Sequence, residues 1–408
     1  MLEMLNNSYF VLLMIGLIIS LGYLIWRPES VPAFIFLLLS GLGSFYSATS
    51  IQRVTLLKAV LLPVLFAVLL FRKFLRSGRL PLSGFTWVIG YGALVVASCL
   101  INGTNINDYR ASLGILLIPL VVALCPKNEK TVSYITIAFA FWGLANLMVV
   151  VATWAGLGWA KAYSSGNAIY TSHRAQGLMG HSTLMGIYFV ISLNAVHVLF
   201  FQARTRVMRV ALFILGAGLA VGLLGTLSRG AFAGWVVSFL FIQYRLQGIK
   251  VGSIIGVCVL SGVVLGISSF LNLDDLMLGR FTSMSVDPSA KDRIPLLEMG
   301  KRLFYSNPLL GVGLGQGGRA HLEAHNTYMQ VLMENGVIGF ILFSTVVWKG
   351  IRGLRKSAVA GTSAAPNPAA AYYIGLLGSM AAILLDAVTH VFDYLMPLWL
   401  ILGIGFMV

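Results

Sequence analysis

The stretch "VSYITIAFAFWGLANLMVVVATW", Val132 to Trp154, runs for 23 residues without a charged side chain. A helix needs about 20 apolar residues to cross the hydrocarbon layer of a bilayer, which is roughly 30 Å thick. This stretch therefore predicts a transmembrane helix. Similar apolar runs recur along the chain, so we expect an all-α fold: a polytopic integral membrane protein with about twelve transmembrane helices.

The composition excludes an ordinary soluble globule. Of the 408 residues, 58% are hydrophobic and 10% are charged, and the mean hydropathy is +0.89. Such a chain has too little polar surface to cover a soluble core. The formal net charge is +15, but much of it lies in short loops between apolar segments, where it reports orientation. We therefore expect membrane lipids as partners and no nucleic acid.

Twelve apolar runs are long enough, as helices, to be predicted spans. They are Tyr9 to Trp26, Val54 to Phe71, Phe85 to Ile101, Ser112 to Cys125, Val132 to Trp154, His181 to Phe201, Val210 to Leu227, Ala231 to Tyr244, Val251 to Leu271, Thr327 to Trp348, Ala371 to Val388 and Tyr394 to Val408. Val31 to Ser47 is interrupted by glycines and serines, so it is either a re-entrant pair or a thirteenth span.

Basic loops alternate along the chain with loops poor in Lys and Arg. The basic ones are "RKFLRSGR" (72–79), "PKNEK" (126–130), "QARTRVMR" (202–209), "RLQGIK" (245–250) and "GIRGLRK" (350–356). The positive-inside rule places these loops in the cytoplasm and the others outside. The longest outward loop divides the chain into N-terminal transmembrane helices (1–271), a small helical loop domain (272–325) and C-terminal transmembrane helices (326–408).

The outward loop domain contains its own amphipathic helix in "KDRIPLLEMGKRLFYSNP", residues 291–308. Asp292 suits the N-cap, Glu298 and Arg302 form an i, i+4 pair, and Asn307-Pro308 ends the helix. Such a helix could lie on the membrane surface and cover a cavity.

Four arginines, Arg174, Arg229, Arg280 and Arg293, lie on the predicted outward face. Guanidinium groups match the paired oxygens of phosphate and stay charged at any pH, so several in one cavity would bind a pyrophosphate. The alternative is that each reaches lipid headgroups or pairs with a loop carboxylate. Arg229 lies in a tight turn between two spans, where a charge is usually functional.

His325 begins the motif "HNTY" and directly precedes Asn326, a good N-cap for a helix that starts at Thr327. The positive end of the helix dipole disfavours an imidazolium, so we expect a neutral ring near pH 7. A neutral imidazole can accept the proton of a sugar hydroxyl that becomes a nucleophile. The alternative is a histidine that only makes a hydrogen bond at the membrane interface.

Two features of the same region concern the backbone. Asn335-Gly336 predicts a break inside the span that follows His325. The stretch "GLGQGG" (313–318) matches G-x-G-x-x-G, but no strand leads into it, so we interpret it as a flexible loop that presents His325.

The acidic residues do not suggest a metal site. Asp274 and Asp275 are adjacent but lack a third ligand nearby, so we expect no metal and no cofactor, and arginines in place of magnesium at a leaving group. Asp386, His390 and Asp393 lie near one helical face of a late span. They could relay protons in a transporter, but we favour a structural network around His390.

Four stretches, in this order, resemble the O-antigen ligase and polymerase superfamily of bacterial envelopes. They are "HRAQGLMGHSTLMG" (173–186), "LSRGAFAGW" (227–235), "KDRIPLLEMGKRLFYSNPLLGVGLGQ" (291–316) and "HNTYMQVLMENGVIGF" (325–340). The resemblance implies a metal-independent, inverting glycosyltransferase of the bacterial inner membrane with its active site at the periplasmic face. The donor would be an undecaprenyl-pyrophosphate-linked glycan and the acceptor lipid A-core, and the loop domain would be periplasmic.

The resemblance also implies roles for particular residues. His325 would be the base that activates the acceptor hydroxyl. Arg174 and Arg280 would be the first pyrophosphate ligands, with Arg293 and Arg229 as further ones. Asn326 of the H-N motif joins the expected substrate-binding residues.

Within this superfamily the sequence favours an O-antigen ligase. One modest outer domain centred on the H-N motif argues against a polymerase, and the lack of a long soluble extension after Val408 argues against a protein O-oligosaccharyltransferase. A lipid-linked glycan transporter is a more distant alternative, in which Asp386 and His390 would matter more than His325.

Overall fold

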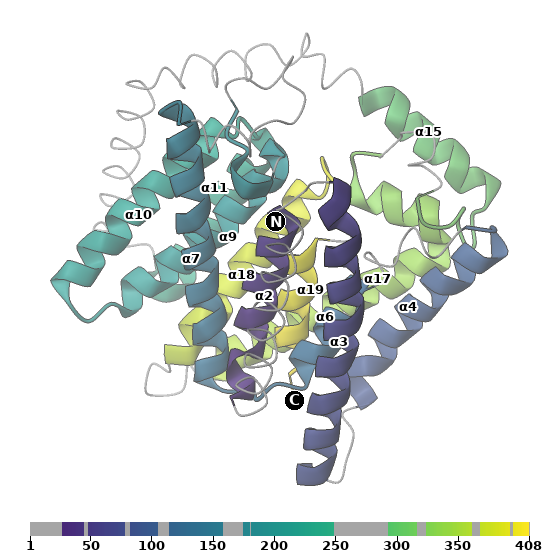
Figure 1. The fold of residues 1–408 in the computed structure, drawn as a ribbon, viewed down its shortest axis with the longest axis horizontal. Coiled ribbons are helices and arrows are strands. Elements are labelled where there is room, and N and C mark those ends of the chain that lie inside the picture. The colour runs from purple at the N-terminus through teal and green to yellow at the C-terminus, as the bar shows by residue number, and fades with distance from the viewer. Residues whose placement is uncertain are drawn as a thin grey trace, which may run out of the picture.

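A computed structural model describes residues 27–44, 48–77, 82–104, 114–157, 174–179, 181–248, 293–315, 324–360, 368–391 and 395–407. Within these ranges every regular element is a helix (Figure 1). In chain order they are η1 (Pro28–Ser30), α2 (Val31–Ser44), α3 (Ala48–Ser77), α4 (Leu82–Ile101), α6 (Leu117–Ala123), α7 (Glu129–Trp154), η3 (Gly177–Met179), α9 (Ser182–Gln202), α10 (Arg206–Gly225), α11 (Arg229–Gln247), α15 (Arg293–Ser306), α17 (Thr327–Ala360), α18 (Pro368–Asp386) and α19 (Met396–Gly405).

Among the described residues, five helices are long and apolar enough to cross a membrane: α7, α9, α10, α17 and α18. Shorter apolar helices cover Pro28–Ser40, Phe85–Ile101 and Met396–Gly405. The architecture is therefore that of a helical membrane protein, as predicted, while a total of about twelve spans stays a prediction. The predicted spans Tyr9 to Trp26 and Val251 to Leu271 lie outside the described residues.

Two predicted spans contain helices that are too short to cross a bilayer alone. The run Ser112 to Cys125 yields the seven-residue α6, and Tyr394 to Val408 yields the ten-residue α19. These two helices pack against each other, and an added Cβ at Gly403 of α19 would lie 2.8 Å from Pro119 Cα of α6. Both are nearly fully buried, so their apolar residues serve the protein core, which hydropathy alone does not distinguish from lipid contact.

Helix direction separates the basic loops from the segments predicted to face outward. α9 and α10 form a hairpin whose connection, Ala203–Thr205, is followed by Arg206 and Arg209. α17 and α18 form a second hairpin. Tyr328 Oη donates to Leu384 O at one end (2.8 Å), and Tyr373 lies near Ser357 at the other, next to Arg355 and Lys356. The basic residues of both hairpins therefore lie at one end of the bundle. The start of α9, the start of α17 and the end of α18, which were predicted to face outward, lie at the other end.

α17 has the break predicted at Asn335-Gly336, where Gly336 has φ 65° and ψ −171°. Residues 308–313 pack against it and satisfy its backbone: Val337 N donates to Pro308 O (2.8 Å) and Val312 N donates to Met333 O (2.9 Å). An added Cβ at Gly336 would overlap Leu309, so only glycine allows this approach. Non-helical backbone at depth is thus covered by protein.

The predicted amphipathic helix forms as α15 and ends before Asn307-Pro308. The predicted ion pair between Glu298 and Arg302 was wrong. The partner of Glu298 is Lys301, whose Nζ lies 2.7 Å from Glu298 Oε1. Positions i, i+3 are neighbours on a helix as much as i, i+4 are. The pair is exposed and contributes little to stability. Figure 1 shows α15 at the edge of the bundle, where it contacts α17.

Candidate functional site

His325 lies two residues before the start of α17, half-buried, with a φ of 46° that non-glycine residues rarely adopt. The N-cap predicted for Asn326 is confirmed, because its Oδ1 accepts a hydrogen bond from Met329 N (2.9 Å). Its Nδ2 donates to Val388 O (2.9 Å) in the turn after α18. Asn326 therefore fixes the backbone beside His325, and its predicted contact with substrate would use the remaining amide hydrogen.

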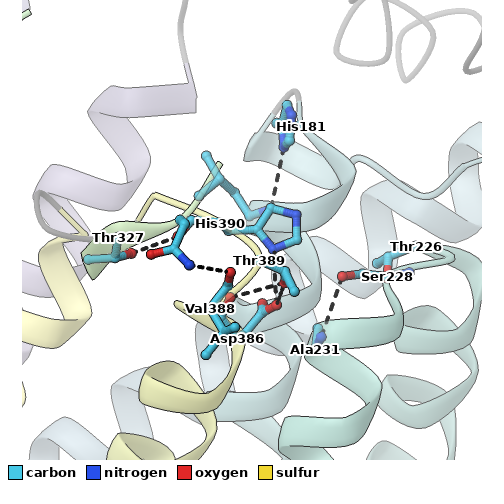
Figure 2. A network of polar contacts seen from close by, with 11 residues as sticks. His181, Thr226, Ser228, Ala231, Thr327, Asp386, Val388, Thr389 and His390 are labelled. Atoms are coloured by element: carbon cyan, nitrogen blue, oxygen red, sulfur yellow. Dashed lines mark hydrogen bonds and ion pairs between the residues drawn. The ribbon is translucent and has the colours of Figure 1, made fainter. Parts of the chain in front are cut away.

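The turn after α18 is joined to the start of α17 by backbone contacts as well. Thr327 N donates to Ala387 O (2.8 Å), and Thr327 Oγ1 donates to His390 O (2.6 Å). Figure 2 shows Thr327 beside this turn, with the His390 side chain on the turn's other side. Two segments far apart in the sequence are thereby held together at the candidate base.

A carboxylate–imidazole pair lies in this turn. Asp386, the last residue of α18, is fully buried, and its Oδ1 lies 3.0 Å from His390 Nδ1. Thr389 Oγ1 is 3.0 Å from the same carboxylate oxygen and 2.9 Å from His390 Nδ1. A carboxylate that accepts the Nδ1 proton fixes the tautomer and leaves Nε2 as the basic nitrogen. His390 lies beyond the end of α18 rather than on its face, and Asp393 lies outside the described residues.

Arg174 lies in the segment before α9, at the same end of the bundle as the Asp386–His390 pair. Its Nε donates to Thr226 O (3.0 Å), and Ala175 N donates to Gly225 O (2.7 Å). The segment before α9 is thus fixed to the turn between α10 and α11. A half-buried guanidinium is thereby held at the predicted outward face.

His181 is the N-cap of α9, and its ring lies near the turn that carries His390. Its Nδ1 accepts from Leu184 N at 3.5 Å, and Figure 2 shows it facing the His390 ring. Part of His181 is exposed, but the surrounding protein atoms penalise the charged ring. That desolvation first, and then the electrostatic effects of His390, Arg174 and His325, lower the pKa of His181 to about 4. His390, Arg174 and His325 therefore each lie close enough to His181 to act on the charge of its ring.

Sequence reasoning did not single out His181, although it lies in the quoted stretch "HRAQGLMGHSTLMG". The signal that could have found it is a histidine at a helix start within a stretch that carries a candidate arginine. Its place beside His390 depends on tertiary packing.

The remaining predicted arginines differ in what the structure shows. Arg229 is the first residue of α11, half-buried, after the N-cap Ser228, whose Oγ accepts from Ala231 N (3.4 Å). The next residue, Gly230, lies against Asp386, so this turn adjoins the Asp386–His390 pair. Arg280 lies outside the described residues.

Arg293 begins α15, the helix that lies over the His325 segment. An added Cβ at Gly300 of α15 would be 3.2 Å from Met329 Cγ and 3.6 Å from Ala324 Cβ. These two residues flank His325 closely in sequence. α15 therefore contacts the start of α17, while its predicted place over a cavity stays a prediction.

Residues 211–344 match the family model Wzy_C, O-antigen ligase. The match supports membership of the O-antigen ligase and polymerase superfamily, and with it a membrane enzyme of the glycosyltransferase kind in lipopolysaccharide assembly. Together with the apolar helices it supports a bacterial inner-membrane protein. In general terms, the family implies a lipid-linked glycan and lipid A-core as partners. No curated protein matches the chain significantly.

The matched region contains Arg229, Arg280, Arg293, His325 and Asn326. It begins after Arg174 and ends before the Asp386–His390 pair. The structure bonds the turn of that pair to the H-N motif and places the turn that Arg174 bonds against Asp386, so the candidate site extends beyond the matched residues.

Proposed function

We propose that this protein is an O-antigen ligase, which transfers a glycan from undecaprenyl pyrophosphate to lipid A-core. One observation carries the proposal. The turn between α10 and α11, which Arg174 bonds at Thr226 O (3.0 Å), lies against Asp386 at Gly230, and the next residue, Ala387, accepts a bond from Thr327 N, two residues after His325 (2.8 Å). The expected base and the first expected pyrophosphate ligand thus lie in one place, within or next to a region that matches O-antigen ligases.

The proposed reaction is a single displacement. The acceptor hydroxyl oxygen forms a bond to the anomeric carbon of the donor sugar, and the bond from that carbon to the pyrophosphate oxygen breaks. The bonding electrons leave with undecaprenyl pyrophosphate, and the hydroxyl proton goes to the imidazole of His325. One displacement at the anomeric carbon inverts its configuration.

The leaving group gains negative charge as the bond breaks, and the arginines stabilise it. Arg174 has a guanidinium fixed by its bond to Thr226 O, and a preorganised cation costs little reorganisation during the reaction. Arg229, Arg280 and Arg293 are the further proposed ligands. This arrangement supplies positive charge without a divalent cation.

The periplasmic orientation is part of the proposal. The basic residues that follow α9 and those near the end of α17 lie at the end of the bundle opposite to His325 and Asp386. The positive-inside rule then places the candidate site on the non-cytoplasmic side.

The test uses the full chain in lipid nanodiscs with lipid-linked glycan, with and without lipid A-core, in the presence of a chelator. A ligase forms product only when the acceptor is present. Extension of donor alone would indicate the polymerase that the family match also allows. Glycan on an added polypeptide would indicate a protein glycosyltransferase, and movement across a bilayer without bond exchange a transporter. Loss of transfer in the chelator would contradict the metal-free reaction.

A further inference from the structure

Two buried polar side chains of α17, Gln330 and Glu334, lie one helical turn apart and bond each other. They are 5% and 3% exposed, and Gln330 Nε2 donates to Glu334 Oε1 at 2.7 Å. A buried carboxylate is costly unless hydrogen bonds compensate for the lost water. Polar groups kept at such positions need a reason beyond filling space.

The pair also receives two backbone N–H groups from the loop that leads to His325. Gly315 N donates to Glu334 Oε1 (2.9 Å), and Ala324 N donates to Gln330 Oε1 (3.0 Å). Gly315 and Ala324 flank the segment 316–323. One connected pair of side chains therefore bonds Gly315, before that segment, and Ala324, after it, and Ala324 directly precedes His325.

The backbone around Glu334 is held by further hydrogen bonds that do not involve its side chain. Gly313 N donates to Glu334 O (3.0 Å), and Ser98 Oγ of α4 lies within hydrogen-bond distance of both Leu310 O (2.7 Å) and Glu334 O (3.0 Å). Asn102 Nδ2 donates to Gly311 O (3.0 Å). Glu334 thus stands where α4, α17 and residues 308–313 meet, so a bond to its side chain is a bond to the rigid part of the fold.

His325 needs this support because its backbone is strained. A non-glycine residue at φ 46° stays there only when its neighbours determine the geometry. Asn326 is fixed on one side by its cap and its bond to Val388 O, and Ala324 is fixed on the other by Gln330.

We infer that Gln330 and Glu334 are positioning residues that set the His325 imidazole for proton transfer by holding Ala324 and Gly315. This inference rests on the proposed function of His325. Misplacing a reacting group by about 1 Å can cost on the order of 100-fold in rate, so loss of these bonds acts on turnover and leaves donor binding intact.

The experiment uses the full chain in nanodiscs and measures turnover, donor affinity and melting temperature for each variant. Gln330→Leu keeps the size of the side chain and removes the acceptor of Ala324 N–H. We expect turnover to fall about tenfold or more with donor affinity near wild type, and the melting temperature to drop, because Ala324 N–H and the Glu334 carboxylate each lose a buried partner. Gln243→Leu is the control, because it removes a partly buried side-chain bond, to His197 Nε2 (3.2 Å), far from His325; its turnover should stay unchanged.

An exchange of the two side chains gives a second test that does not depend on Gln330→Leu folding. Gln330→Glu alone places two carboxylates together with no donor between them. The double variant Gln330→Glu, Glu334→Gln restores the bond between the two side chains, with donor and acceptor reversed, and keeps an acceptor for Ala324 N–H, but it loses the bond from Gly315 N, because Glu334 Oε1 accepts both bonds in the wild-type protein. We expect the double variant to turn over at least about ten times faster than the single one at equal amounts of folded protein.

Wild-type turnover in folded Gln330→Leu, or a double variant no faster than Gln330→Glu, would overturn the inference. Donor affinity that falls together with turnover would also overturn it, because the pair would then act on binding. Loss of transfer in His325→Ala alongside either result leaves the proposed function standing, so the two failures are distinguishable.

Discussion

Gly230 lies against the carboxylate of Asp386, so that the first turn of α11 touches the last residue of α18 with no side chain between them. The same carboxylate holds His390 Nδ1 at 3.0 Å. The turn that carries Arg229 and the turn that carries His390 therefore depend on one glycine for their contact.

Replacing this glycine should disturb the site. In Gly230→Ala the new Cβ would overlap Asp386 Oδ1 and lie 2.7 Å from Thr389 Oγ1, so the turn after α18 must shift. We expect transfer to fall and the melting temperature to drop, measured on purified protein in nanodiscs. Gly90→Ala in α4 is the control, since its Cβ meets nothing within 4 Å. Equal behaviour of the two variants would contradict the contact.

The Asp386–His390 pair should act mainly on stability. His390→Leu leaves a fully buried carboxylate without its imidazole partner, and removing one member of a buried pair costs roughly 3 kcal/mol or more. In the double variant His390→Leu, Asp386→Leu, the second substitution should cause little further loss of stability or restore it, because it removes the carboxylate left without its partner. The single variant Asp386→Leu completes the set. Unfolding measured with denaturant on all three variants checks this. A His390→Leu protein of normal stability that transports or transfers nothing would indicate a functional pair instead.

Arg174 should contribute through both its charge and its shape. If Arg174 binds the pyrophosphate as proposed, Arg174→Gln removes a cation from the leaving group, and we expect turnover to fall on the order of 100-fold. Arg174→Lys keeps the charge but loses the planar fork, so its turnover should lie between those of Arg174→Gln and wild type. The control is Arg204→Gln, an exposed arginine beyond the far end of α9. Unchanged kinetics in Arg174→Gln would mean that this arginine only holds Thr226.

The lowered pKa of His181 predicts a pH dependence of stability. The unfolded ring titrates near its ordinary value of 6.5 and the folded ring at about 4. Above pH 6.5 both states are neutral and the ring contributes nothing. Between these values only the unfolded state binds the proton, so stability falls as the pH drops and the full penalty is present below pH 4.

His181→Asn tests that pH dependence without loss of the cap, because Asn is a good N-cap and does not titrate. We expect the melting temperature of the wild-type protein to fall more steeply from pH 7 to pH 4 than that of His181→Asn. Parallel curves would show that the His181 ring is not held neutral by its surroundings.

Local features of this fold could be predicted from the sequence because their causes are local. An asparagine before a helix predicted the cap at Asn326, and Asn335-Gly336 predicted the break in α17. Apolar runs predicted helices such as α7 and α9, since composition alone decides whether a helix suits a bilayer. Hydropathy could not show that α6 and α19 are short helices of the core.

The site could be predicted only in part. His325 and the arginines belong to motifs, but the place of His181 beside His390 depends on how α9 packs near α18, far apart in the sequence. The bonds from Gln330 and Glu334 to Ala324 and Gly315 follow from the break in α17 and the packing of residues 308–313 against it. Sequence patterns report residue types and spacing, whereas these contacts depend on tertiary structure.

The most direct test of the account is the transfer rate of His325→Ala, measured in nanodiscs with lipid-linked glycan and lipid A-core. General base catalysis contributes roughly 100- to 10,000-fold, so turnover should fall by about that factor while donor binding and melting temperature stay at the wild-type values. Transfer by folded His325→Ala at the wild-type rate would contradict the assignment of His325 as the base.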